Sequence, residues 1–185
     1  MLILVGPSAS GKTEVANILI NKYQMVRMIT YTTRPIRVGE VDGVSYHFVT
    51  KDEFIKLKES DEFVETVYYN DNYYGTRKSD VKNNKIVILE PSGLNAFNEK
   101  MKNDVVSFYL NTNEVERINR MIYRKDKKED IDKRIQNDRK VFKDVKDVDY
   151  IIDNENVLLT DLADKIYNIY KKEIRRKTNG SFNWN

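Results

Sequence analysis

The chain alternates short, wholly apolar runs with amphipathic stretches. Leu2–Val5 is apolar without interruption and stops at Gly6, which predicts a strand buried on both faces. After Gly11, apolar side chains recur at helical spacing up to Tyr23, and a second apolar run, Met25–Ile29, follows. A strand, a helix and a strand in about thirty residues form a βαβ unit, so the sequence predicts an α/β fold with a parallel sheet.

Residues 31–76 do not follow this alternation of apolar strands and amphipathic helices, because their apolar runs are shorter and lie among arginines, glycines and tyrosines. Thr50 and Glu53 form a capping box that predicts a short helix, and residues 63–69 predict a strand. No Pro- or Gly-rich linker bounds this segment, so it is interpreted as an inserted lobe rather than a separate domain. The α/β rhythm then resumes, with strands expected at 86–89, 105–110 and 150–152, and helices at 94–102, 114–124, 130–142 and from Thr160.

Composition narrows the possible functions. The chain of 185 residues carries 32 Lys and Arg against 29 Asp and Glu, and a net charge of +3 is too small to indicate a surface built for nucleic acid. It has no Cys, and His47 is its only His, which excludes disulfides, zinc fingers, Cys nucleophiles and His-based triads. No apolar run approaches membrane length and none reads as a signal peptide, so a cytoplasmic location is predicted.

A phosphate-binding pattern, G-x-x-x-x-G-K-[ST], is matched by Gly6, Pro7, Ser8, Ala9, Ser10, Gly11, Lys12 and Thr13. The two glycines allow a tight turn whose backbone N–H groups converge on phosphate oxygens. Lys12 adds a cation for the β- and γ-phosphates, and the Thr13 hydroxyl can ligate Mg²⁺. Because an apolar strand precedes the motif and an amphipathic helix follows it, the sequence predicts a nucleoside triphosphate site.

A second group of phosphate ligands lies in the inserted lobe. Arg34 and Arg37 can each offer a planar guanidinium to a phosphate, and Tyr46 can add a hydroxyl. Farther along, Glu65 supplies a carboxylate that can accept both N1–H and the exocyclic amine of guanine, whereas adenine presents an acceptor at N1. Isolated arginines on loops are usually solvated, but the order and spacing of this set favour a monophosphate clamp.

At these motifs the sequence resembles the guanylate kinase family, whose members phosphorylate GMP with ATP. The resemblance is carried by T-T-R-x-x-R-x-G-E-x-x-G-x-x-Y-x-F over 32–48, by Phe63–Glu65 and by Tyr73–Gly75, and it spans about 1–170. It implies a P-loop α/β core with an inserted mixed GMP-binding lobe and a helical lid. It also implies that the GMP phosphate is held by Arg34, Arg37, Tyr46 and Tyr74, and that guanine faces Glu65, Thr30 and Thr76.

The resemblance divides a single domain, 1–185, into four parts: a core (about 1–30, 77–119 and 141–176), the lobe (about 31–76), the lid (about 120–140) and a flexible tail (177–185). With Lys12, the lid residues Arg120, Arg124 and Arg134 would stabilise the transferring phosphoryl group. The lid departs from the family's Arg-Gly-Thr-Glu-like turn, because residues 124–129 read Arg-Lys-Asp-Lys-Lys-Glu. The sequence therefore leaves the contacts of the lid unassigned.

Acidic and amide residues follow two of the predicted strands. Glu90 comes after 86–89, where the family more often has two aspartates, and it is grouped with the GMP site while a water-mediated role at the metal stays open. Asp153 and Asn154 fall where the family contacts adenine, so they are assigned to ATP.

The predicted function is Mg²⁺-dependent transfer of the γ-phosphoryl group of ATP to GMP, giving ADP and GDP. The expected partners are ATP and GMP or dGMP, with no nucleic acid and no membrane, for a monomer or homodimer. One alternative is a catalytically silent interaction module, which the intact Gly11, Lys12 and Thr13 oppose. Another is a kinase with a different phosphorylated acceptor, which the altered Glu90 and lid segments favour.

Overall fold

The computed structural model describes residues 1–69, 71–155 and 157–177. Its core is a five-stranded parallel sheet in the order β2-β7-β1-β8-β9. In chain order these strands are β1 (Leu2–Val5), β2 (Val26–Arg27), β7 (Lys85–Leu89), β8 (Val106–Asn111) and β9 (Tyr150–Asp153). The central strand β1 is fully buried, as its uninterrupted apolar run predicts. The predicted α/β fold with a parallel sheet is confirmed.

Helices cover both faces of this sheet. Leu2 and Leu4 pack with α1 (Lys12–Tyr23) and α6 (Leu159–Lys177), while Ile3 and Val5 pack in a second cluster with α3 (Pro91–Met101). The alternation follows from the two-residue period of a strand, which sends neighbouring side chains to opposite faces. Short 3₁₀ helices, η1 (Lys78–Asp80) and η2 (Lys102–Asp104), precede β7 and β8.

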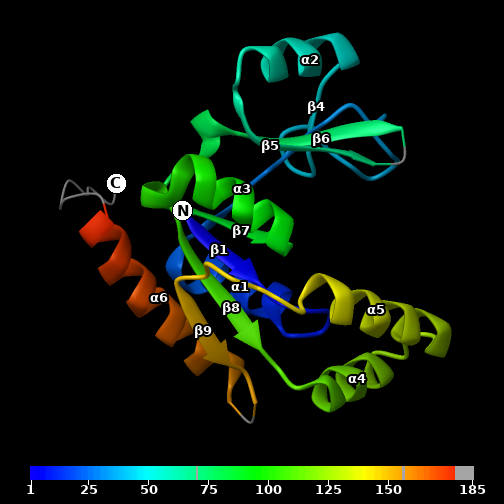
Figure 1. The fold of residues 1–185 in the computed structure, drawn as a ribbon, viewed down its shortest axis with the longest axis vertical. Coiled ribbons are helices and arrows are strands. Elements are labelled where there is room, and N and C mark those ends of the chain that lie inside the picture. The colour runs from blue at the N-terminus through cyan, green and yellow to red at the C-terminus, as the bar shows by residue number, and fades with distance from the viewer. Residues whose placement is uncertain (70, 156, 178–185) are drawn as a thin grey trace.

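A second, mixed sheet lies at one end of the molecule, in the order β4-β3-β6-β5 (Figure 1). Its members are β3 (Tyr31–Thr32), β4 (His47–Phe48), β5 (Phe63–Tyr69) and β6 (Asn72–Arg77), and α2 (Lys51–Glu59) packs over it. Phe54 of α2 is fully buried and its ring lies 4.5 Å from that of Phe63. The predicted capping box at Thr50 is confirmed, since both of its reciprocal hydrogen bonds to Glu53 are formed.

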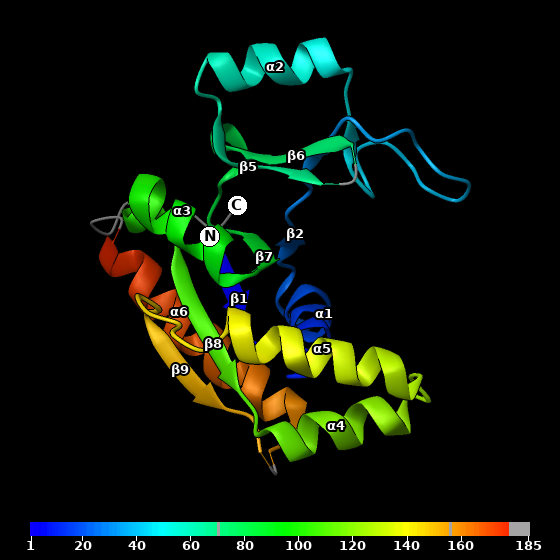
Figure 2. The same cartoon turned by 45° about the vertical axis from the view of Figure 1, so that its right-hand side comes forward.

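Two helices, α4 (Glu114–Tyr123) and α5 (Lys128–Val141), form a hairpin at the other end, beyond the carboxyl end of β8 (Figure 2). The side chain of Asn113 caps α4 by accepting from the N–H of Glu116. Met121 of α4 packs with Ile131 and Ile135 of α5. The phosphate loop therefore lies between this hairpin and the parallel sheet.

One predicted strand is shorter than expected. The apolar run Met25–Ile29 forms only the two-residue β2, in which Val26 and Arg27 are exposed. The reason is its place at the edge of the sheet, where only β7 pairs with it. Residues 178–185 of the expected tail lie outside the described residues. Among the residues that are described, no helix is both long and apolar enough to cross a membrane.

Candidate active site

The loop between β1 and α1 turns tightly onto the N-terminus of α1. Gly11 caps this helix at φ +91°, a left-handed conformation that favours glycine. A Cβ atom at Gly6 would lie 2.8 Å from Ser10 Oγ and 2.9 Å from the carbonyl oxygen of Leu110. One at Gly11 would lie 2.7 Å from Asn154 Nδ2. Close packing therefore requires both glycines, and the N-terminal N–H groups of α1 lie where an anion can reach them.

Lys12 is folded back onto this loop. Its Nζ donates to the carbonyl oxygens of Gly6, at 2.6 Å, and Pro7, at 2.7 Å. Burial lowers the pKa of the ammonium from 10.5 to about 8, and the nearby Asp138 carboxylate opposes part of that shift. A poorly solvated ammonium beside helix-terminal N–H groups is a strong binding centre for phosphate.

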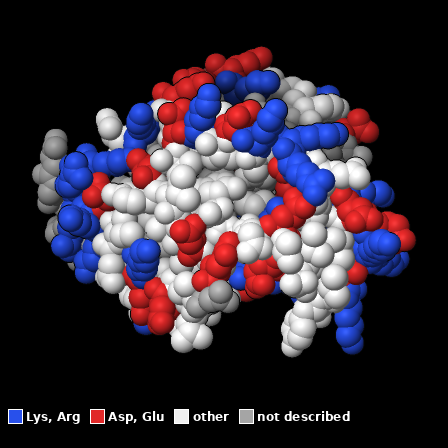
Figure 3. All heavy atoms as spheres, turned by 60° about the horizontal axis from the view of Figure 1, so that its bottom comes forward, with Lys and Arg blue, Asp and Glu red and all other residues white. Residues whose placement is uncertain are grey.

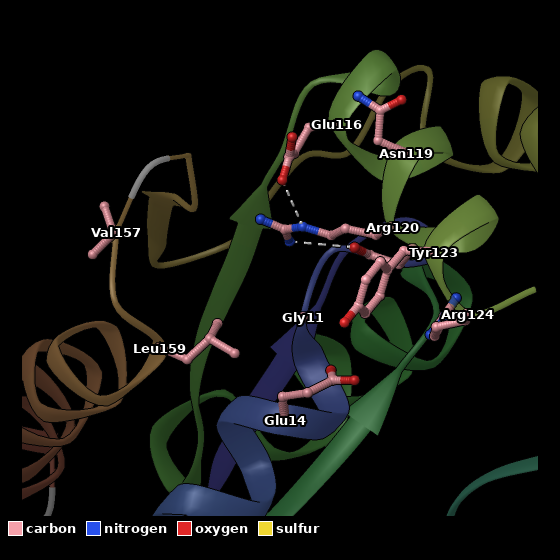
Figure 4. A pocket seen from close by; sticks show the side chains of 10 residues that line it. Gly11, Glu14, Glu116, Asn119, Arg120, Tyr123, Arg124, Val157 and Leu159 are labelled. Carbon is pink, nitrogen blue, oxygen red and sulfur yellow. Dashed lines mark hydrogen bonds and ion pairs between the residues drawn. The ribbon is translucent and has the colours of Figure 1, made fainter.

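A cavity of about 640 Å³ opens beside the phosphate loop (Figure 4). In Figure 4, Val157 and Leu159 stand on one side of it, Tyr123 and Arg124 stand opposite, and Glu14 lies at its base. Its apolar wall and adjacent charged groups suit a nucleoside next to a triphosphate. The full lining is Ala9, Gly11, Glu14, Glu116, Asn119, Arg120, Tyr123, Arg124, Val157 and Leu159.

The three arginines predicted for the lid lie on the α4–α5 hairpin. Arg120 and Arg124 line the cavity, and Arg120 donates to the carbonyl oxygen of Ala9 at 3.4 Å. Arg134 does not line that cavity; its NH1 lies 3.2 Å from Asp126 Oδ2, an oxygen that Arg124 also contacts at 3.5 Å. Asp126 therefore holds two of the predicted catalytic arginines near each other across the hairpin turn.

Asp153 and Asn154, predicted to contact adenine, lie at the end of β9. Neither lines the cavity of Figure 4. Asn154 is fully buried, and its Nδ2 donates to the carbonyl oxygen of Ser10 at 2.7 Å. Asp153 is exposed and accepts from Asn111. Asn154 thus holds the phosphate loop through its bond to Ser10. Val157 and Leu159, a few residues later, line the cavity.

In the smaller sheet, Arg34 lies among aromatic rings. Its guanidinium carbon is 5.4 Å from the ring centre of Tyr46, and the rings of Tyr46 and Tyr74 are 6.0 Å apart. Its NH2 donates to Glu40 Oε1 at 2.6 Å, and the other Glu40 oxygen accepts the backbone N–H of Arg37 at 2.8 Å. The structure brings Arg34, Tyr46 and Tyr74 together, and leaves the Arg37 side chain exposed on the same loop.

The predicted guanine-facing residues occupy two places. Glu65 of β5 lies opposite Thr76 of β6, whose hydroxyl donates to Glu65 Oε1 at 2.9 Å. Burial raises the pKa of the Glu65 carboxyl. Thr30 instead lines a cavity of about 260 Å³ together with Tyr46. The predicted guanine and phosphate ligands therefore belong to one small lobe, with Glu65 on β5, Tyr74 and Thr76 on β6, and Arg34 and Tyr46 on the segment between β3 and β4.

Glu90 lies beside the phosphate loop. With Lys12 it lines a cavity of about 240 Å³, and it is absent from the lining of the cavity that contains Thr30 and Tyr46. Ile88, two residues earlier on β7, lines both cavities. The two predicted phosphate sites therefore adjoin across the end of β7, at the carboxyl edge of the parallel sheet where α/β folds bind ligands.

The structure adds residues that sequence reasoning left without a role. Glu40 orients Arg34, and Asp126 holds lid arginines, whereas Arg117 and Asp138 form an ion pair next to the phosphate loop. The sequence contained a signal for Arg117. Arg117 stands one helical turn before the buried Met121, so it is a charged residue on an apolar helix face.

Charge is distributed in small groups. On the face drawn in Figure 3, Lys and Arg are interspersed with Asp and Glu, and uncharged side chains line the hollow near its middle. Cations that could meet an anionic ligand instead line cavities, with Lys12 in one and Arg120 in another.

Comparisons with known proteins agree with this geometry. A family model described as guanylate kinase matches residues 1–173. The guanylate kinase of Bartonella quintana (strain Toulouse) is 30% identical over 190 residues, covering 98% of this chain and 85% of the relative. That of Clostridioides difficile (strain 630) is 33% identical over 165 residues, covering 85% and 80%. The crystal structure of guanylate kinase from Anaplasma phagocytophilum matches with a TM-score of 0.64 at 27% identity, covering 94% of this chain and 85% of that one.

Proposed function

This chain belongs to the guanylate kinase family, and on that premise we propose that the adjoining cavities carry out transfer of the γ-phosphoryl group of ATP to GMP, giving ADP and GDP. The proposal is supported by the position of Ile88, which lines both the cavity that contains Lys12 and the cavity that contains Thr30 and Tyr46. A donor phosphate on one side and an acceptor phosphate on the other would meet at the end of β7.

The protein's part in this reaction is positioning and electrostatic stabilisation. The N–H groups of the phosphate loop and Lys12 bind the triphosphate, and Arg120 and Arg124 approach it from the hairpin. The triphosphate's nucleoside would fill the cavity of Figure 4, against Val157 and Leu159. No general base is required, because a nucleotide monophosphate already carries an anionic oxygen at neutral pH.

The residues present fit a magnesium ion that arrives with ATP. Thr13 presents an exposed hydroxyl in the first turn of α1, next to Lys12. Among the described residues, no group of three or more His, Cys, Asp or Glu side chains gathers as a metal site. A single hydroxyl from Thr13 suits Mg²⁺, because this ion is commonly held by few protein oxygens together with water and substrate phosphates. When bound, the ion would offset negative charge between the β- and γ-phosphates.

The acceptor site supports GMP as substrate. Arg34, Tyr46 and Tyr74 form the phosphate clamp, with Arg37 supplied by the same loop as Arg34. Glu65 would accept the two guanine N–H groups, and Thr76 holds its carboxylate in place. Glu40 accepts a hydrogen bond from Arg34 NH2 in the free protein, so an incoming phosphate must share that donor or displace Glu40 from it.

A coupled assay of ADP release tests the proposal by comparing GMP, dGMP, AMP, CMP and UMP as acceptors. Turnover is expected with GMP and is expected to be lowest with AMP, whose N1 acceptor opposes the Glu65 carboxylate. Faster turnover with another nucleotide would assign the site to a different acceptor. No turnover with any acceptor would indicate an interaction module instead.

The low pKa of Lys12 predicts how nucleotide affinity changes with pH. In the free protein the ammonium loses its proton as pH rises through about 8, whereas a bound polyphosphate stabilises the protonated form and raises its pKa. Affinity for ADP is therefore highest below this pKa and should fall towards tenfold per pH unit above it. Binding at about pH 9 should then take up a proton, measurable by calorimetry in buffers of different ionisation enthalpy. The uptake should vanish in Lys12→Met; uptake that persists there would assign the proton to another group.

A further inference from the structure

An ion pair lies buried where the α4–α5 hairpin meets the phosphate loop. Arg117 NH1 of α4 donates to Asp138 Oδ2 of α5 at 2.7 Å. The two side chains are only 7% and 5% exposed. A buried pair of charges is costly to desolvate and contributes little net stability in many proteins, so its place in the fold needs a further reason.

All three polar groups of Ser8 in the phosphate loop bind this pair. Its backbone N–H donates to Asp138 Oδ2 at 2.9 Å and its hydroxyl donates to Asp138 Oδ1 at 3.1 Å. Its carbonyl oxygen accepts from Arg117 NH1 at 3.4 Å. The pair therefore fixes one residue of the loop in both position and orientation, from a distance of more than a hundred residues along the chain.

The next residue explains why the loop needs to be held. Ala9 has a φ of +59°, in the left-handed region that residues with a Cβ atom adopt at a cost. The loop also brings Lys12 close to backbone N–H groups, an arrangement that favours negative charge nearby. In the free protein, the Asp138 carboxylate supplies negative charge next to Lys12.

We propose that Arg117 and Asp138 are positioning residues that hold the phosphate loop, with its left-handed Ala9, in the shape that binds ATP before ATP arrives. The inference rests on the proposed use of this loop for ATP. Preorganisation of this kind strengthens binding because the cost of ordering the loop is met during folding rather than at binding.

A second ion pair offers a matched control. Arg139 of α5 bonds to Glu114 of α4, so it also links the two helices of the hairpin, but the Arg139 side chain is 64% exposed. Glu114 also lies 3.9 Å from Arg117 NH2, so Arg139→Met changes a neighbour of the buried pair but leaves the contacts of that pair with Ser8 in place. A general effect on the hairpin should appear in Arg139→Met, whereas an effect on the loop should not.

The test measures binding of ADP and of GMP by calorimetry to four proteins: the wild type, Arg117→Met/Asp138→Ala, the same double variant with Ala9→Gly, and Arg139→Met. Both charges are removed together because a single replacement would leave the other buried and unpaired. The double variant should bind ADP about tenfold more weakly with nearly unchanged GMP affinity, since the cost of the left-handed Ala9 is no longer offset. Adding Ala9→Gly, which relieves that cost, should restore most of the ADP affinity. Arg139→Met should match the wild type.

Unchanged ADP affinity in the double variant would overturn the proposal, and so would a failure of Ala9→Gly to restore it. A parallel loss of GMP binding would point to a general loss of structure and would also count against it. If the double variant does not fold, Arg117→Gln/Asp138→Asn, which also removes both charges, gives the same comparison with and without Ala9→Gly. Absence of ADP binding in the wild type would instead contradict the proposed function.

Discussion

Replacement of Lys12 by methionine is expected to lower kcat about 10³-fold, because no other group on the phosphate loop supplies a mobile cation to the transferring phosphate. The fold should survive the change. Burial lowers the pKa of Lys12 to about 8, which means that folding disfavours its charge, so an apolar side chain of similar length should not lower the free energy of unfolding. Steady-state kinetics and a thermal melt of the same sample measure the two effects separately.

Lys22→Met is the matched control, since Lys22 lies on the same helix but is about half exposed and pairs with Asp164 on the surface. A surface pair of this kind contributes at most about 1 kcal/mol to the free energy of unfolding. Because Lys22 lies in the last turn of α1 and not on the phosphate loop, kcat should be unchanged. If Lys12→Met kept a kcat within about tenfold of the wild type, the phosphate would have to be stabilised elsewhere.

Replacement of Glu65 by glutamine is expected to lower kcat/KM for GMP about 10²- to 10³-fold, while affinity for ATP stays the same. The carboxylate can accept both guanine N–H groups, whereas an amide must present one N–H donor to them and leaves a donor facing a donor. Thr76 fixes the orientation of Glu65, so the side chain cannot turn away freely to avoid the conflict. Kinetics with GMP and a binding titration with ATP distinguish the two substrates.

Glu62→Gln is the control for this change, because Glu62 directly precedes the strand that carries Glu65 but is ion-paired with Arg77 and partly exposed. Wild-type turnover of GMP in Glu65→Gln would remove guanine recognition from this residue. Equal losses in the two variants would indicate damage to the small sheet instead.

Local features of the sequence were sufficient for much of the fold. The apolar run Leu2–Val5 and the glycines that follow encode a buried strand and a tight turn through neighbouring residues alone, and the structure confirms both. The capping box at Thr50 is likewise a contact within one helical turn. By contrast, β2 is short because its neighbours in the sheet make it an edge, which the apolar run Met25–Ile29 did not reveal.

The candidate site also contains residues that local sequence identifies and contacts that only the structure reveals. The sequence identified Lys12, Arg34 and Glu65 as candidates through motif spacing. It assigned Asn154 to adenine on resemblance, but it could not show that this side chain is buried against the carbonyl oxygen of Ser10, a contact 144 residues apart in the chain. That assignment to adenine stays a prediction.

By itself, the sequence determined a parallel α/β core and a tight glycine-containing loop, and it predicted a second phosphate-binding segment, because each is encoded by side chains within a few residues of one another. Only the tertiary structure decided that the cavities containing Lys12 and Tyr46 share Ile88 and that Arg117 and Asp138 meet at Ser8. Those contacts depend on how the strands are ordered in the sheet and on how the hairpin packs against it. Such packing is set by the whole core, so no local pattern in the sequence records it.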